Sequence, residues 1–401
     1  MLLASKELEA DNKPGQSYFI HPNEITLPEN YRFFMLAVIL CIFFLLMVVV
    51  PVVYAERKVA AFMQDRLGPT EAGPHGILQP LLDVIKLLEK EDIIPAKADK
   101  PLFAYAPVII FAAVLAGFAV IPISPNIISS GAYLGVFYLL AIVSLDVIGL
   151  LMAGWGSNNK YAVLGAMRSV GQIISYEIPA GLAVLSVVMI CQSLDFQEIS
   201  FQQGILMNQF AGLEKETNYL FGLKALGLDV TQIGGITTWN IVRMPFLIIG
   251  FVIYFISSLA ECNRAPFDIP EAESELVAGF HVEYSGFRFA ALFLAEYSLM
   301  ILVCLVAVIL FLGSWNTPLP NIGAVALANW TTGSVGSWSG NLWGIFWLLS
   351  KTMLLVYTQI WIRWTYPRLR VDQLMHLCWK VFTPLALGLV LLAGIWRLLM
   401  I

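Results

Sequence analysis

Six carboxylates lie within one short stretch, residues 261–283, between two long apolar runs. A single fixed cation, Arg264, stands among them, with His281 as a titratable neighbour. Carboxylates this close do not all ionise at their ordinary pKa values once some of them are partly buried. The stretch fits either a loop that handles protons or cations, or a solvated acidic loop. Its carboxylates are Glu261, Asp268, Glu271, Glu273, Glu275 and Glu283.

Several ionisable residues, Glu261 again among them, fall inside apolar runs or at their ends. A charged group within a bilayer costs about 2.5–3.5 kcal/mol on insertion scales, so each one needs a partner or a role. Structural pairing explains one such residue, but the number found here favours proton transfer through the membrane. We expect Lys351 to pair with a buried carboxylate. The residues in question are Glu56, Asp146, Glu177, Glu261, Glu296 and Lys351.

The composition predicts an all-α polytopic membrane protein. The 401 residues are 59% hydrophobic and 13% charged, with a mean hydropathy of +0.77, whereas soluble domains carry about 25% charged residues. The apolar runs are continuous rather than alternating, which indicates helices. Eight of them approach the roughly 20 residues that span a bilayer. The eight predicted transmembrane helices are 33–53, 101–123, 132–153, 170–191, 241–260, 288–313, 342–362 and 380–400.

Lysine and arginine placement predicts the orientation. With the N-terminus outside, the inner loops hold fourteen of these residues and the outer segments six. Because cytoplasmic loops carry the cationic excess, both termini are predicted to be periplasmic. We expect one integral membrane domain over 1–401. It would have an N-terminal periplasmic extension, 1–30, cytoplasmic functional loops at 54–100 and 261–286, and a periplasmic insert at 192–240.

The first inner loop contains an amphipathic helix, residues 76–92. Gln79, Asp83, Lys86 and Lys90 share one helical stripe, and leucine and isoleucine cover the rest. Such a helix lies either in the membrane interface or against a partner protein. Both explanations remain open from the sequence.

Cysteine and histidine usage argues against a cofactor in this chain. The five cysteines form no close pair, and there are four histidines, so an iron–sulfur cluster or a structural zinc site is not expected. The sequence has neither a phosphate-binding glycine loop nor a dinucleotide fingerprint. We therefore expect no metal and no redox cofactor here, and no catalytic residue in this chain itself.

Four motifs resemble one family. They are ERKVAAFMQDRLGPTEAGPHGILQPLLDVIKLLEKEDIIP, GWGSNNKYAVLGAMRSVGQIISYE, AECNRAPFDIPEAESELVAGFHVEYSGF and PRLRVDQLMHLCWKVFTPLAL. In this order, from residue 56 to about 387, they resemble the quinone-site membrane subunit of respiratory complex I, the NADH:quinone oxidoreductase. This is the bacterial H subunit or mitochondrial subunit 1. The family has eight transmembrane helices in the orientation predicted above.

The resemblance implies a place in a larger assembly. The chain would lie in the bacterial inner membrane, beside antiporter-like and small membrane subunits and under peripheral-arm subunits that hold FMN and the iron–sulfur clusters. Quinone would be the substrate, reached through a tunnel that this chain largely forms. Lipid is expected as a partner and nucleic acid is not. The resemblance assigns the tunnel to Arg57, Arg66, Asp83 and Arg264.

The resemblance also implies proton coupling. Quinone reduction draws protons and changes the local charge, which shifts the pKa values of nearby groups in a low-dielectric path. Carboxylates in the acidic loop would respond and pass the change into the membrane. The residues implied are Glu56, Glu177, Glu261, Asp268, Glu271, Glu273, Glu275 and Glu296.

Three alternatives remain at this stage. A secondary transporter could use the same buried carboxylates to bind a substrate or sodium, although such folds often show inverted repeats, which are not visible here. The chain could instead serve a related complex, such as a membrane-bound hydrogenase or a ferredoxin-linked oxidoreductase. It could also be a purely structural anchor for the peripheral arm.

Overall fold

The computed structural model describes residues 31–128, 130–210, 213, 217–224, 227–270, 273–321 and 326–400, with side chains from residue 46 onward except 273, 274 and 400. Within these ranges every regular element is a helix or a helical turn. There is no β-strand in them, only two isolated β-bridges. The all-helical class is therefore confirmed. The chain divides into two compact units, Met1–Leu46 and Met47–Ile401, and the packing below is that of the second.

Six helical stretches in the described residues are long and apolar enough to cross a membrane. Each coincides with a predicted span. They are Lys100–Val120 (α4, Lys100–Gly117, with η2, Phe118–Val120), Gly135–Gly156 (α5, Gly135–Val143, with α6, Leu145–Gly156), α7 (Lys160–Cys191), α12 (Gly286–Phe311), α14 (Trp338–Thr365) and Val371–Leu399 (α15, Val371–His376, η8, Leu377–Phe382, and most of α16, Thr383–Met400).

The other two predicted spans are not confirmed. The first lies on α2 (Tyr31–Met63), where side chains are described only from residue 46. The fifth is divided into α9 (Asn240–Arg243) and α10 (Leu247–Glu261). Met244 is extended because Pro245 follows it, and a residue before proline avoids the helical region. The described residues thus show six candidate spans, and the count of eight remains a prediction.

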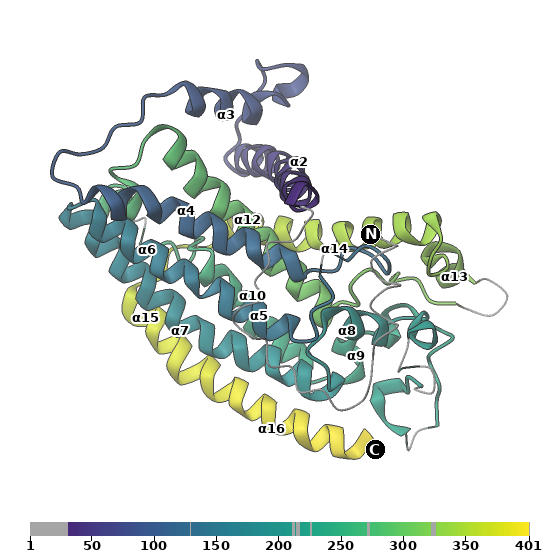
Figure 1. The fold of residues 1–401 in the computed structure, drawn as a ribbon. Helices are drawn as coiled ribbons and strands as arrows, with labels where there is room; N and C mark the ends of the chain where they lie inside the picture. The colour runs from purple at the N-terminus through teal and green to yellow at the C-terminus, as the bar shows by residue number, and fades with distance from the viewer. Residues whose placement is uncertain are drawn as a thin grey trace. The chain divides into compact units, whose positions relative to one another are not determined.

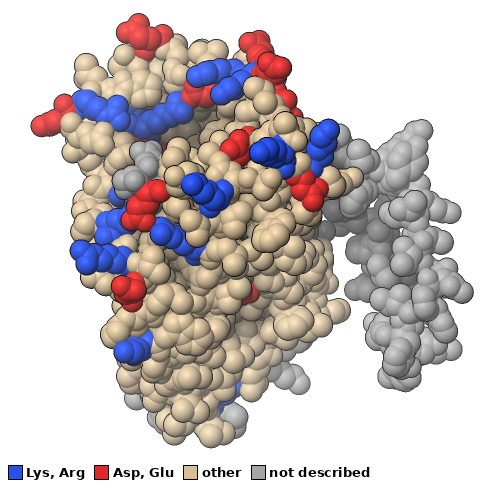
Figure 2. Space-filling view, turned by 90° about the vertical axis from the view of Figure 1, so that its left-hand side faces the viewer, with Lys and Arg blue, Asp and Glu red and all other residues tan. Residues whose placement is uncertain are grey.

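The helices of the second unit pack around α12. Figure 1 shows α4, α6 and α7 running side by side, with α16 along the far side of α7. Helix α12 packs against α4, α10 and α14, and every side chain from Tyr297 to Phe311 is buried. On the face seen in Figure 2, charged side chains gather at one end and uncharged residues cover most of the other. This division suits a protein that lies partly in lipid.

Small residues let three helices approach closely. A Cβ atom on Gly149 of α6 would lie 2.3 Å from Cγ1 of Ile110 on α4. One on Gly154 would lie 2.3 Å from Cβ of Ala166 on α7. Association within a membrane depends on such close backbone packing, because lipid tails are as apolar as the side chains. Gly149 and Gly154 therefore hold α6 between its two neighbours.

Short helices fill the connections. The predicted amphipathic helix is present as α3 (Gln79–Glu89), which follows the turn η1 (Pro74–Gly76). The insert at 192–240 contains α8 (Phe196–Gln202) and the turns η3 (Met207–Gln209), η4 (Leu220–Gly222) and η6 (Gly235–Thr238). The acidic loop contains α11 (Glu273–Leu276) and η7 (Gly279–His281), and α13 (Leu327–Thr332) precedes α14. The predicted extension 1–30 lies outside the described residues.

Candidate functional site

A buried ion cluster joins α2, α12 and α14 to the start of the acidic loop. Nη1 of Arg264 donates to both carboxylate oxygens of Glu56, at 2.9 and 3.0 Å. Arg363 from α14 donates to the same carboxylate, and the Tyr297 hydroxyl donates to it at 2.6 Å. The guanidinium of Arg264 stacks over the Tyr297 ring at 4.2 Å. Three donors on three segments thus stabilise one buried carboxylate.

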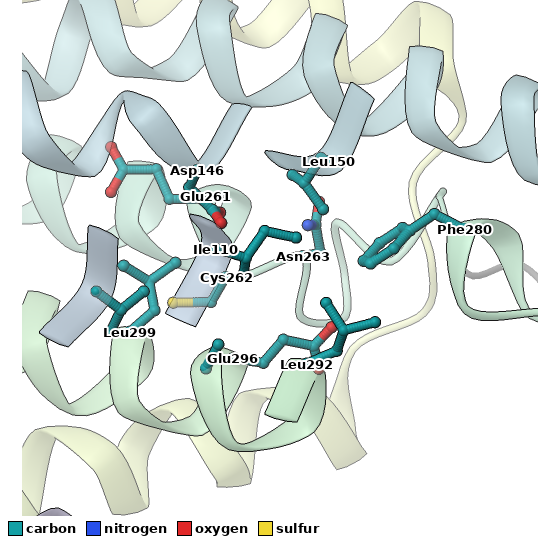
Figure 3. Close-up of a pocket in the computed structure, with 12 residues that line it drawn as sticks. Ile110, Asp146, Leu150, Glu261, Cys262, Asn263, Phe280, Leu292, Glu296 and Leu299 are labelled. Atoms are coloured by element: carbon teal, nitrogen blue, oxygen red, sulfur yellow. The ribbon is translucent and has the colours of Figure 1, made fainter. Parts of the chain in front are cut away.

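Three carboxyl side chains surround a small cavity next to this cluster. The cavity has a volume of about 20 Å³, which is room for one water molecule. Figure 3 shows Asp146, Glu261 and Glu296 around it, from α6, α10 and α12 respectively. Asp146 is 8% exposed, and its Oδ1 atom accepts no hydrogen bond from the described residues. A water molecule here would have several polar partners.

The buried ion cluster around Glu56 and the three carboxyl groups around the cavity belong to one row of ionisable residues. Arg264 interacts electrostatically with Glu296 as well as with Glu56. Glu296 in turn interacts with Asp146, and Glu261 with Glu177. The row therefore runs from Glu56 through the cavity to Glu177. Its members come from α2, the acidic loop, α12, α6, α10 and α7.

Glu177 ends the row in an apolar groove at the surface. The groove has a volume of about 520 Å³ and is lined by α5, by α7 and by Leu194. Glu177 is its one ionisable lining residue among those described, and the others are aliphatic or aromatic apart from Gly181. A carboxyl in such a groove lies within reach of whatever covers it.

The acidic loop is fixed by partners on other segments. Arg168 on α7 donates to Glu275 at 2.7 Å and holds the pKa of that carboxyl below its usual range. Arg368 pairs with Asp268 at 3.2 Å, and Asn159 donates to Glu283 at 2.6 Å. These contacts fasten the loop to α7 and to the segment that follows α14. Glu271 and the side chain of Glu273 lie outside the described residues.

The first inner loop is tied to the acidic loop at the start of α12. The amide of Ile93 donates to Oγ of Ser285 at 3.1 Å, and that hydroxyl donates to the carbonyl of Glu91 at 3.3 Å. Arg288 pairs with Asp92 at 3.1 Å. Gly286 has a φ of +56°, and a Cβ there would lie 2.8 Å from the Lys90 carbonyl, so only glycine fits. The two loops therefore share one junction.

Two of the four predicted tunnel residues meet near the surface. Arg57, in the last two turns of α2, forms an ion pair with Asp83 on α3. Arg66 is exposed and donates to Gln64 at 2.8 Å. Arg264, the fourth, lies in the buried cluster with Glu56 instead. The structure thus brings Arg57 and Asp83 together and places Arg264 with the proposed proton-coupling residues.

Known proteins resemble this chain over nearly its whole length. The NADH dehydrogenase family model matches residues 35–394. The NADH-quinone oxidoreductase H subunit numbered 2 in Cytophaga hutchinsonii is 58% identical over 362 residues, which cover 90% of this chain and 98% of the relative. The chain belongs to the NADH dehydrogenase family. The H subunit of Chlorobium luteolum is 50% identical over 348 residues, covering 86% of this chain and 84% of the relative. The resemblance to the H subunit of complex I is therefore confirmed.

One expectation for this family member was wrong. Lys351 on α14 has no carboxylate partner among the described residues. Its ammonium donates to the backbone carbonyls of Leu312, Ser314 and Asn316 at 2.8, 3.0 and 2.6 Å, and it lies 4.3 Å from the centre of the Trp239 ring. The backbone carbonyls that follow α12 have no hydrogen-bond donor from a described helix. The ammonium of Lys351 supplies that donor, and the carbonyls take the place of the expected carboxylate. Lys351 therefore fastens α14 to the end of α12.

Two neighbours of the ionisable row, Arg363 and Tyr297, had no predicted role, and a third, His281, was expected only as a titratable neighbour of the acidic loop. Arg363 and Tyr297 complete the shell of Glu56, and His281 lies 2.9 Å from Glu296 through its Nε2 atom. The charge of Arg363 at the end of an apolar run was a usable signal. Tyr297 gave none, because a tyrosine in an apolar helix has many uses. In the described part of the chain, no group of three His, Cys, Asp or Glu residues is placed to hold a metal ion.

Proposed function

We propose that this chain is the membrane subunit of a proton-translocating NADH:quinone oxidoreductase that couples quinone reduction to proton translocation. The observation that carries the proposal is the row of ionisable residues from Glu56 to Glu177 through a water-sized cavity. The relatives are named as H subunits of NADH-quinone oxidoreductase, which supports this reaction. Such a row suits proton transfer, because neighbouring members interact electrostatically and one water fits between three of them.

The first inner loop and α2 would form much of the quinone tunnel. Arg57, Asp83 and Arg66 supply charged and polar groups near exposed leucines and isoleucines of α3, including Leu81 and Ile85. A substrate with an apolar tail and a polar headgroup needs both kinds of surface. Arg264 lies deeper, on Glu56, where it would sense the charge of a reduced headgroup.

Coupling would begin at the ion cluster and the acidic loop. A negative charge gained by the headgroup would compete with Glu56 for Arg363, whose side chain is 30% exposed, while Arg264 at 7% stays with Glu56. Such a change would alter the charge balance at Glu296, and through it at Asp146 and Glu261. Asp268, Glu271, Glu273 and Glu275 would respond in the loop. Glu177 would pass the change to a neighbouring antiporter-like subunit across its groove.

The remaining expectations form part of the same proposal. The chain would lie in the bacterial inner membrane with eight transmembrane helices, namely the six identified above, α2 and the α9–α10 segment. Both termini would be periplasmic, as the cationic inner loops predict. FMN and the iron–sulfur clusters would belong to peripheral-arm subunits, and this chain would bind quinone without a redox cofactor of its own.

Purification of the tagged chain from its own membranes tests the proposal. We expect it to elute in a large multi-subunit assembly that reduces quinone with NADH and is blocked by quinone-site inhibitors. A chain that elutes alone would contradict the proposal and favour a transporter. An assembly that does not reduce quinone with NADH would instead assign the chain to a complex with another electron donor.

A further inference from the structure

The connection between α12 and α14 is unlike the other long connections, because it carries no charge. From residue 297 to residue 350 the sequence contains no Asp, Glu, Lys, Arg or His. Lys351 ends this stretch, and its ammonium turns inward to three backbone carbonyls. The part of the connection outside the helices therefore offers no ionic group to water or to a charged partner.

Large aromatic side chains stand at the surface of this stretch. Trp330 on α13 is 74% exposed and Trp338, the first residue of α14, is 84% exposed. The Trp330 ring lies 6.4 Å from the Trp343 ring, which stacks on Trp347 at 6.4 Å. Phe346 contacts the Trp343 and Trp347 rings and is 53% exposed. These side chains form what we term the aromatic patch: Trp330, Trp338, Trp343, Phe346 and Trp347.

Side chains satisfy several backbone polar groups beneath the aromatic patch. Nε1 of Trp347 donates to the Thr331 carbonyl at 3.2 Å. Oδ1 of Asn321 accepts from the amides of Ala328 and Asn329, and Ser337 caps α14 by accepting from the amide of Gly340 at 3.0 Å. A segment that leaves bulk water needs such internal pairing, since unpaired backbone groups are costly there.

Position along α14 gives the depth of the aromatic patch. Trp338 begins a helix that is long and apolar enough to cross a membrane. Trp343 and Trp347 lie further along it, and at 1.5 Å per residue the patch extends about 13 Å from the helix start. Tryptophan gathers at the boundary between headgroups and acyl chains, where one edge of the ring stays polar and the rest is apolar.

From these observations we propose that the aromatic patch seats α13 and the start of α14 in the headgroup region of the lipid bilayer. The occupant of this surface is neutral phospholipid, because no cation in the patch could select an anionic headgroup. The inference uses the membrane-spanning character of α12 and α14 but not the quinone chemistry. It can therefore fail while the proposed function stands, and the reverse also holds.

Fluorescence quenching in the intact complex tests this inference. A Trp330→Cys variant would be labelled with bimane and placed in nanodiscs whose lipids carry a doxyl group at acyl carbon 5 or carbon 14. Unsubstituted complex gives the background from native thiols. We expect the shallow carbon-5 lipid to quench at least twofold more than the carbon-14 lipid, equally in zwitterionic and anionic bilayers. A Trp338→Cys variant repeats the test on α14. If the substitution at Trp330 disturbs the folding of α13, the label at residue 338 still reports the depth of the patch.

A water-exposed site serves as the matched control. Lys97→Cys, at an exposed position in the charged first loop, should show no quenching by either lipid. Absence of quenching at residues 330 and 338 would overturn the inference. Water-like emission would then place the aromatic patch in solvent, and blue-shifted emission would show that another protein covers it. Quenching only in anionic bilayers would overturn the neutral-lipid part.

Discussion

Glu56 is the residue on which the buried cluster depends. Glu56 is 5% exposed, and its carboxylate receives donors from Arg264, Arg363 and Tyr297. Arg264 also interacts with Glu296, so two guanidinium groups and two carboxyl groups share this cluster. A further negative charge nearby would change the balance among them.

Glu56→Gln should destabilise the assembled complex. The substitution keeps the shape but leaves Arg264 buried without a charged partner at 2.9 Å, which costs about 3–5 kcal/mol. We expect a lower Tm and less assembled complex, measured by thermal unfolding and by native gels. Glu89→Gln, at an exposed position on α3, is the control and should change neither. An unchanged Tm for Glu56→Gln would show that the pair contributes nothing.

The tether between Arg168 and Glu275 should depend on pH. Arg168 holds the pKa of Glu275 below its ordinary value of 4.5. The contribution of the pair is therefore present above pH 4.5 and lost as the pH falls through the lowered pKa. Hydrogen exchange at α11, corrected for the intrinsic rate, should be constant from pH 8 to pH 6 and rise only below about pH 4.5. Faster exchange already at pH 6 would disprove the tether, and Glu275→Gln should remove the acid transition.

At the scale of helices, close packing and end contacts determine how the row is held. Helix α6 carries Asp146 and must approach α4 closely at Gly149. Helix α14 carries Arg363 and is fastened to α12 through Lys351. Ile110, which Gly149 approaches, also lines the cavity, whereas the Lys351 contact lies at the far end of α12 from it.

Gly149→Val should weaken the packing of α6 on α4. Any Cβ at residue 149 meets Ile110 at 2.3 Å, and overpacking of this kind costs about 1–3 kcal/mol. We expect a lower Tm of the purified complex. Gly171→Ala on α7 is the matched control, because nothing lies within 4 Å of its Cβ position, and it should leave Tm unchanged or slightly raised. Equal Tm values for the two variants would contradict the close approach.

Lys351→Met should act on stability rather than on turnover. The variant leaves three carbonyls without their ammonium donor, and an unpaired buried polar group costs about 1–3 kcal/mol. We expect less assembled complex with near-normal quinone reduction per assembled unit. Loss of turnover at normal Tm would instead make Lys351 part of the proton path.

For the whole molecule, the helical class and six of the spans were predicted correctly from the sequence. A long continuous apolar run can satisfy its backbone hydrogen bonds in a membrane only as a helix or as part of a closed barrel, and these runs do not alternate as barrel strands do. The break at Pro245 was missed although the sequence carried a signal for it, because Arg243 and Pro245 interrupt the start of the fifth run. The candidate carboxylates were visible as charges in apolar surroundings. Their partners were not, because Arg363 and Glu56 are brought together only by the packing of helices far apart in the chain.

The sequence also could not predict which tunnel residues would lie apart from the proton-coupling residues. Arg264 and Asp83 were expected to serve the same tunnel, yet Arg57 pairs with Asp83 and Arg264 pairs with Glu56. Charge alone does not say which opposite charge a residue meets. That choice depends on where α2 ends relative to α3 and on how the acidic loop leaves α10.

Glu261 offers the most direct test of proton coupling, because it links the cavity to Glu177. The measurement is NADH:quinone turnover and NADH-driven proton translocation by vesicles that contain Glu261→Gln, at equal amounts of assembled complex. We predict normal assembly with at least a tenfold loss of turnover, while Glu89→Gln behaves as the unsubstituted complex. Normal turnover and normal translocation by assembled Glu261→Gln complex would contradict the account and leave the chain as a structural anchor.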